Sequence, residues 1–161
     1  YKGELKDVVE EVTALLPGGE TKTFSADELD FSYRHSVFTD SDMIVLSAKI
    51  RLEKGDREEI GAKINEVNKK RRTTQPLEYP SAGSAFKRPA NGYAAAMIDA
   101  CGLKGFAVGG AQVSEKHAGF VINRGGATAE DMLTLLAYVR QTVKEKCDTL
   151  LEPEIVIIGE K

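Results

Sequence analysis

The longest amphipathic pattern in the sequence constrains the fold more than any other feature. Thr128 and Asp131 have the spacing of a capping box, which predicts the start of a helix over residues 129–147. Its apolar side chains recur on one face, at Met132, Leu135, Leu136, Val139 and Val143. A helix with one apolar face must pack against another layer, so we assign this stripe to the core and give it no chemical role.

Short strand patterns surround this helix. Residues 106–113 and 119–123 predict two strands joined by a polar turn, and the alanine-rich residues 93–101 predict a helix that ends at a glycine. Residues 155–158 are apolar throughout, which predicts a strand at the centre of a sheet. We therefore expect an α+β domain in which helices pack on a small mixed sheet.

The first third of the chain has a different pattern. Residues 8–16 and 21–24 predict a hairpin around a Pro-Gly-Gly turn, and residues 43–52 predict a further strand. Ser25 and Glu28 fit a capping box for a short helix.

A second helix is expected to begin at Asp56, whose side chain can cap it, with Glu59 three residues on. Its buried stripe is predicted to be Ile60, Ile64 and Val67. We place a domain boundary just before this helix, which divides the chain into residues 1–54 and 55–161.

Composition excludes several classes of protein. The net charge is −3, whereas a general nucleic-acid-binding protein is usually strongly basic. Cys101 and Cys147 lack the spacing of a metal or redox motif, and His35 and His117 are far apart, so we expect free thiols and no metal site. The sequence contains no run of about 18 apolar residues, so it predicts no membrane-spanning helix. We expect a soluble, cytoplasmic protein.

Residues 71–89 are the stretch most suited to chemistry. They open on a basic pair, contain three prolines, and place small residues just before Ser84. Gly83 permits a backbone conformation that other residues avoid, and Lys87 and Arg88 suit an anionic ligand. The alternative is a polar surface loop interrupted by proline.

The order of residues in this stretch resembles a known family. Gln-Pro-Leu-Glu-Tyr-Pro-Ser-Ala-Gly-Ser at residues 75–84, followed by Phe-Lys-Arg-Pro, is similar to the signature segment of the UDP-N-acetylenolpyruvoylglucosamine reductases. Residues 31–38, 103–117 and 151–159 resemble further family stretches in the expected order. These are flavin enzymes of peptidoglycan precursor synthesis.

The resemblance implies an activity and its cofactors. NADPH reduces bound FAD, and the enolpyruvyl double bond of UDP-N-acetylglucosamine enolpyruvate is then reduced to give UDP-N-acetylmuramate. The family carries a glycine-rich flavin-phosphate loop that is absent from this sequence. The resemblance thus implies that residues 1–54 are the remainder of an FAD-binding domain and residues 55–161 a substrate-binding domain, and that this chain is inactive alone.

The resemblance also implies roles for individual residues. Arg34 matches the family's catalytic arginine, whose guanidinium can hold the substrate carboxylate bidentately. Ser84 matches the proton donor, and Glu154 the catalytic glutamate that assists when protonated. The other implied substrate-binding residues are Tyr33, Gln75, Lys87, Arg88 and His117, the last at a position where the family commonly has an amide side chain.

Two other functions remain open from the sequence. A nucleotide-sugar-binding module without redox chemistry would keep the basic loop but would not need Arg34, Ser84 and Glu154 together. An RNA-binding module would use the basic residues 69–72 with Tyr79, but the acidic net charge argues against it.

Overall fold

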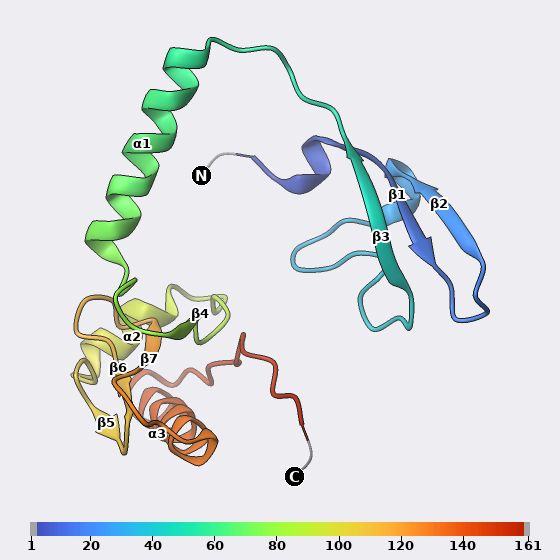
Figure 1. Ribbon diagram of the computed structural model, residues 1–161. Coiled ribbons are helices and arrows are strands. Elements are labelled where there is room, and N and C mark those ends of the chain that lie inside the picture. The colour runs from blue at the N-terminus through green and yellow to red at the C-terminus, as the bar shows by residue number, and fades with distance from the viewer. Residues whose placement is uncertain (1–2, 160–161) are drawn as a thin grey trace. The chain divides into compact units, whose positions relative to one another are not determined.

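The computed structural model describes residues 3–159, and this part of the chain divides into two compact units. Unit 1 is Tyr1–Glu59 and unit 2 is Ile60–Lys161. Both contain helices and strands, which confirms the expected α+β class (Figure 1). Each unit has its own hydrophobic cluster, so each is described by itself below.

Unit 1 is a three-stranded antiparallel sheet in the order β2-β1-β3. β1 (Val9–Leu15) and β2 (Thr21–Ser25) form the expected hairpin, and β3 (Ile44–Ile50) pairs with the other edge of β1. A short 3-10 helix, η1 (Leu5–Asp7), precedes β1, and a second, η2 (Ala26–Leu29), follows β2. The Ser25–Glu28 capping box is present at η2, as the spacing predicts.

The core of unit 1 lies around the hairpin and η2, where Val12, Phe24 and Leu29 are buried. β3 contributes little to it, because every residue of β3 is exposed. The strand prediction for this stretch is confirmed, since its apolar and β-branched residues pair antiparallel with β1, with two shifts of register along the way.

The helix predicted from the Asp56 cap is α1 (Arg57–Thr74). Asp56 Oδ1 accepts hydrogen bonds from the backbone N–H groups of Glu58 and Glu59, at 2.9 and 3.0 Å. The prediction of a buried stripe is wrong among the described residues. Ile60 is 49% exposed, Ile64 is more exposed still, and no residue of α1 is buried. The spacing of the apolar residues correctly indicated a helix, but nothing in the described part of the chain packs closely enough to bury their side chains.

Unit 2 contains a four-stranded sheet in the order β4-β7-β6-β5. The strands are β4 (Ser81–Ser84), β5 (Ala107–Val108), β6 (Ala111–Val113) and β7 (Phe120–Asn123). Every neighbouring pair is antiparallel, so the expectation of a mixed sheet is wrong. Short turns join β5 to β6 and β6 to β7, and a hairpin can connect only antiparallel neighbours, whereas β4 pairs with β7 from far away in the sequence.

The helices of unit 2 supply much of its core. α2 (Ala94–Ala100) and α3 (Ala129–Cys147) match the two predicted helices, and Gly102 follows α2 with a φ of 74°. Leu135, Leu136, Val139 and Val143 of α3 are buried in one cluster with Ile98 of α2 and with residues of β6 and β7. Figure 1 shows α3 (orange) beside these short strands. The core prediction for this helix is confirmed.

The single strand expected over residues 106–113 is two strands with a tight turn between them. Gly109 has a φ of 53°, and a Cβ atom on Gly110 would lie 2.5 Å from both the Ala127 nitrogen and the Gly125 oxygen. Backbone approaches this close leave no room for a side chain, which explains the glycine pair at the turn.

Residues 155–158 form no strand, so that prediction is wrong for the described chain. The segment before them makes one isolated bridge, Phe86 with Pro153, and Val156 to Ile158 are exposed. An apolar run predicts a buried strand only where a sheet edge is available to pair with it.

The capping box of α3 makes a pH-dependent contribution to stability that can be measured. Asp131 Oδ2 accepts a 2.9 Å hydrogen bond from the Thr128 N–H, and Thr128 Oγ1 accepts one from the Asp131 N–H at 3.1 Å. The Thr128 backbone N–H, with smaller contributions from its hydroxyl and from the Gly110 N–H, holds the pKa of the Asp131 carboxyl below its ordinary value. A lowered folded-state pKa stabilises the fold above the unfolded pKa, and this stabilisation is lost as the pH falls through the folded pKa.

We therefore expect Asp131→Asn to lower the free energy of unfolding at neutral pH. The gap from wild type should begin to narrow as the pH falls below about 4, the ordinary pKa of an aspartate, and close below the lowered folded-state pKa. Urea unfolding at several pH values measures this difference in the free energy of unfolding. Glu130→Gln controls for the loss of one negative charge in the same helical turn. A gap that stays constant with pH would show that the Asp131 carboxylate does not act through this cap.

Candidate active site

The strand that carries Ser84 is irregular. β4 pairs with β7 through Ser81 opposite Ile122 and Ser84 opposite Phe120, and the register shifts between these two pairs. Gly83 lies within the shift with a φ of 83°, a conformation that favours glycine. Open space surrounds the position of its missing Cβ, so backbone conformation, not crowding, explains the glycine. The result is a bulged strand end at which the Ser84 side chain is exposed.

The segment after Ser84 pairs with the segment that carries Glu154. The Glu154 N–H donates to the Ala85 carbonyl at 3.0 Å, and the Lys87 N–H donates to the Glu152 carbonyl at 2.8 Å. Ala85 is fully buried and is the residue next to Ser84. The structure thus brings together the two backbone segments on which Ser84 and Glu154 were predicted, although 70 positions separate them in sequence.

The turn that carries His117 lies on the same strand end. The Ala85 N–H donates to the Gly119 carbonyl at 2.8 Å, and the Gly119 N–H donates to His117 Nδ1 at 3.1 Å. His117 also packs edge-on against Phe120, with ring centroids 5.0 Å apart. Because Nδ1 accepts a hydrogen bond, the neutral ring carries its proton on Nε2, which can donate to a ligand.

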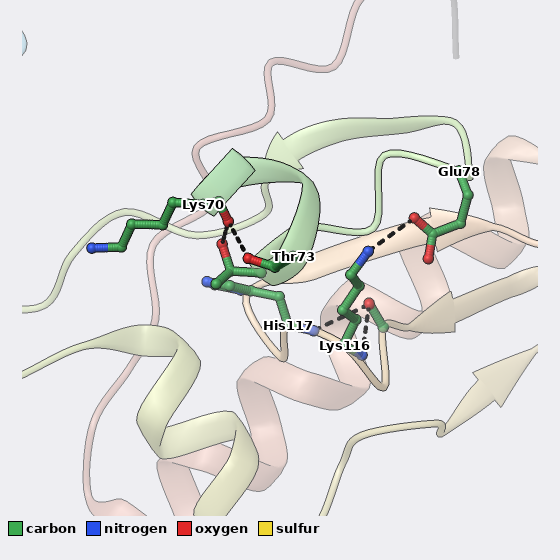
Figure 2. Close-up of polar contacts among 7 residues, drawn as sticks. Lys70, Thr73, Glu78, Lys116 and His117 are labelled. Carbon is green, nitrogen blue, oxygen red and sulfur yellow. Dashed lines mark hydrogen bonds and ion pairs between the residues drawn. The ribbon is translucent and has the colours of Figure 1, made fainter. Parts of the chain in front are cut away.

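Buried Ser114 shapes this turn. Its hydroxyl accepts hydrogen bonds from the N–H groups of Lys116 and His117, each at 3.2 Å. Lys116 Nζ then reaches Glu78 of the signature segment at 3.3 Å, as Figure 2 shows. Hydrogen bonding from the Glu78 backbone N–H, with help from Lys116, lowers the pKa of the Glu78 carboxyl, so it stays ionised.

Lys87 and Arg88 line a pocket of about 400 Å³ together with Asn91, Asp148 and Thr149. Lys87 forms an ion pair with Glu152, and the Arg88 guanidinium lies 4.2 Å from the centroid of the Tyr93 ring. Arg88 Nε also donates to the Gly92 carbonyl at 3.3 Å. Lys87 and Arg88 therefore line one pocket, with the carboxylate of Glu152 beside Lys87.

Gln75 lies just past the end of α1. The Thr73 and Thr74 hydroxyls donate to the Lys70 carbonyl at 2.9 and 2.8 Å in the last turn, the first of these drawn in Figure 2. The Gln75 N–H donates to the Arg71 carbonyl at 2.9 Å, and its side chain is half-buried. Its role in substrate binding stays a prediction.

A further pocket of about 240 Å³ was not anticipated from the sequence. Its lining includes Tyr79, Gln112, Lys116 and Arg124. The Arg124 guanidinium lies 5.4 Å from the Tyr79 ring centroid, and its Nη1 donates to Gln112 Oε1 at 3.0 Å. The only sequence signal was Tyr79 itself, within the signature segment, because Arg124 reaches Tyr79 through the pairing of β4 with β7 and reaches Gln112 through the pairing of β6 with β7.

Tyr33 and Arg34 belong to unit 1. Ser32 and His35 exchange backbone hydrogen bonds of 3.1 and 3.2 Å, so the two residues occupy the tip of a tight turn. Arg34 has a φ of 58°, and its guanidinium lies 5.9 Å from the Tyr33 ring centroid. A positive φ at a residue other than glycine is uncommon and fixes an unusual side-chain direction. That Arg34 acts together with Ser84 and Glu154 stays a prediction.

Within residues 3–159, no group of three or more His, Cys, Asp or Glu side chains could hold a metal ion. No helix in the same range has the length and apolar character needed to cross a membrane.

The fold and the site define a small α+β domain in which an exposed serine and a glutamate lie on paired segments beside a basic pocket. A sequence profile of the UDP-N-acetylenolpyruvoylglucosamine reductase C-terminal domain matches residues 75–158. The chain belongs to this family, which confirms the resemblance seen in its motifs.

Individual relatives agree with this assignment. The chain is 50% identical over its full length to the UDP-N-acetylenolpyruvoylglucosamine reductase of Latilactobacillus sakei and 51% identical to that of Caldanaerobacter subterraneus, covering 53% of each. The crystal structure of UDP-N-acetylenolpyruvylglucosamine reductase (MurB) from Thermus caldophilus superposes with a TM-score of 0.79 at 35% identity, over 94% of this chain and 53% of that one. The chain spans about half the length of the curated relatives it matches.

Proposed function

We propose that this chain is the substrate-binding part of an oxidoreductase of peptidoglycan precursor synthesis. The whole protein would use NADPH and FAD to reduce UDP-N-acetylglucosamine enolpyruvate to UDP-N-acetylmuramate in the cytoplasm. The observation that carries the proposal is the pairing of the Ser84 and Glu154 segments through Ala85. It supports a shared role for two residues that the family motifs single out independently.

FAD would supply the hydride in the whole protein. The described glycines of unit 1 do not form a tight turn of the kind that binds the phosphates of FAD. No neighbouring atom lies within 4 Å of a Cβ built on Gly3, Gly18 or Gly19. We therefore assign flavin-phosphate binding to no residue of this chain. The roles below concern the enolpyruvyl group alone.

The proposed chemistry follows from where charge develops. Hydride addition at the terminal vinyl carbon leaves negative charge on the other carbon and on its carboxylate, so the site must stabilise an enolate and then protonate it. Arg34 would hold the carboxylate with two parallel hydrogen bonds. Ser84 would give its hydroxyl proton to the carbon. Glu154, when protonated, would donate a hydrogen bond to the enolate.

The nucleotide end of the substrate has a separate proposed site. Lys87 and Arg88 would bind the diphosphate in the 400 Å³ pocket they line. His117 would contact the sugar or pyruvyl portion through Nε2, with Tyr33 and Gln75 as further contacts. The ion pair between Lys87 and Glu152 keeps the ammonium group in place before substrate arrives.

The test is a reductase assay on a protein of the relatives' length that contains this chain. We expect NADPH consumption beyond the one equivalent that reduces the flavin only when UDP-N-acetylglucosamine enolpyruvate is present, and the product to be heavier by two hydrogen atoms. UDP-N-acetylglucosamine, which lacks the double bond, is the control and should give no such consumption. Binding of the enolpyruvyl substrate without reduction would overturn the proposal in favour of a nucleotide-sugar-binding module.

A further inference from the structure

The two cysteines of the chain meet at the ends of α2 and α3. Cys101 directly follows α2 and Cys147 is the last residue of α3, and their sulfur atoms are 3.7 Å apart. Both are free thiols. Cys101 is buried in the core of unit 2, and Cys147 is half-buried and packs against the same cluster. No pattern in the sequence predicts this contact, because 46 positions separate the two residues.

Hydrogen bonds hold the backbone on both sides of the pair. Lys146 Nζ donates to the Cys101 carbonyl at 3.2 Å, which ties the end of α3 directly to the end of α2. The Thr149 hydroxyl donates to the Cys147 carbonyl at 3.1 Å and accepts from Asn91 Nδ2 at 3.0 Å. The two sulfur atoms are therefore kept facing each other by contacts that do not depend on the sulfurs themselves.

We propose that Cys101 and Cys147 are a modification site that closes to an intramolecular disulfide when a low-molecular-weight disulfide is present. A disulfide bond is about 2.0 Å long, so the sulfurs would have to approach by roughly 1.7 Å. The bond would join the C-terminal ends of both helices, just before the segment that carries Glu152 and Glu154.

The order of the two exchange steps follows from exposure. Cys147, the more accessible thiol, attacks the reagent first as its thiolate, which forms a mixed disulfide and releases one reagent thiol. Cys101 then loses its proton and attacks the Cys147 sulfur, which releases the second. Both protein thiols are oxidised and the reagent disulfide is reduced to two thiols. Burial raises the pKa of the Cys101 thiol, and the adjacent Cys147 sulfur adds to the rise, so Cys101 attacks the reagent poorly. Its 3.7 Å distance from the Cys147 sulfur is what allows it to act in the second, intramolecular step.

The experiment incubates the purified 161-residue chain with mixtures of oxidised and reduced glutathione, then alkylates the remaining thiols and measures the intact mass. We expect the loss of both alkylatable thiols, no retained glutathione and no increase in oligomer size on a non-reducing gel. Half-oxidation in native buffer should need at least about 30-fold less oxidised glutathione than in urea, because the fold brings the sulfurs together.

Single variants give the matched controls. In Cys101→Ser, Cys147 should retain one glutathione, since no second thiol is available to displace it. In Cys147→Ser, Cys101 should react at least about tenfold more slowly than Cys147 does in the first variant, because it is buried. A stable mixed disulfide on the wild-type chain, a disulfide-linked dimer, or an equal glutathione requirement in urea would each overturn the proposal.

Discussion

Replacing Ser84 with alanine is expected to lower turnover by about 10²-fold or more, the usual contribution of general acid catalysis. The measurement is the steady-state rate of NADPH consumption with UDP-N-acetylglucosamine enolpyruvate, on a protein of the relatives' length. The loss arises because alanine has no proton to give to the enolate carbon. Reduction of the flavin by NADPH, measured without the enolpyruvyl substrate, should stay nearly unchanged, since that step does not use the hydroxyl.

Ser81→Ala is the matched control. Ser81 lies in the same strand, is exposed like Ser84, and also loses one hydroxyl on substitution. Its Oγ accepts a long, 3.4 Å hydrogen bond from the Gly83 N–H, so the control also tests whether the bulge itself matters. We expect Ser81→Ala to change turnover by no more than a few-fold. Normal turnover in Ser84→Ala, or an equal loss in both variants, would contradict the assignment of Ser84 as proton donor.

Local signals in the sequence predicted the secondary structure well. The capping residues Ser25, Asp56 and Thr128 each lie at the start of the helix that they were expected to begin. A capping box involves residues only three positions apart, so its chemistry is set before the chain folds in three dimensions. The same holds for the β1–β2 hairpin, whose turn residues determine which strands can meet.

Predictions of burial and strand pairing were less successful, because they depend on residues that are far away in the sequence. Ile60 and Ile64 have helical spacing, but burial depends on what packs against them, and spacing does not specify that. Residues 155–158 have the composition of a central strand, yet no described strand pairs with them. The contact between Cys101 and Cys147 was missed for the same reason, since it is formed by the packing of two helix ends.

The candidate site was predicted in part. The signature segment predicted Ser84, Lys87 and Arg88 as site residues, and these roles stay predictions, while the structure adds the backbone hydrogen bond that brings Glu154 to the same segment. The motifs could not reveal the arrangement of Tyr79, Gln112 and Arg124, which arises from strand pairing. A linear motif records which residues are present, whereas these contacts depend on how β7 pairs with β4 on one side and with β6 on the other.

Leu135→Ala is expected to have the largest effect on stability, lowering the free energy of unfolding of unit 2 by about 2–5 kcal/mol. Leu135 is 0% exposed and lies on the face of α3 that packs in the unit's core. Truncation removes buried apolar surface and leaves a cavity that the surrounding side chains fill only partly. A loss of this size is a large share of the 5–15 kcal/mol that typically stabilises a domain.

Leu133→Ala, two residues earlier in α3, separates burial from helix propensity. It makes the same chemical change in the same helix, so the gain in helix propensity from leucine to alanine is common to both variants. Leu133 is 39% exposed, so much of its side chain already contacts water and its loss should cost less than about 1 kcal/mol. Urea unfolding followed by far-ultraviolet circular dichroism measures both variants. Equal destabilisation would mean that the α3 stripe is not the core of unit 2, and the helix would then have to be held by contacts other than those of Leu135, Val139 and Val143.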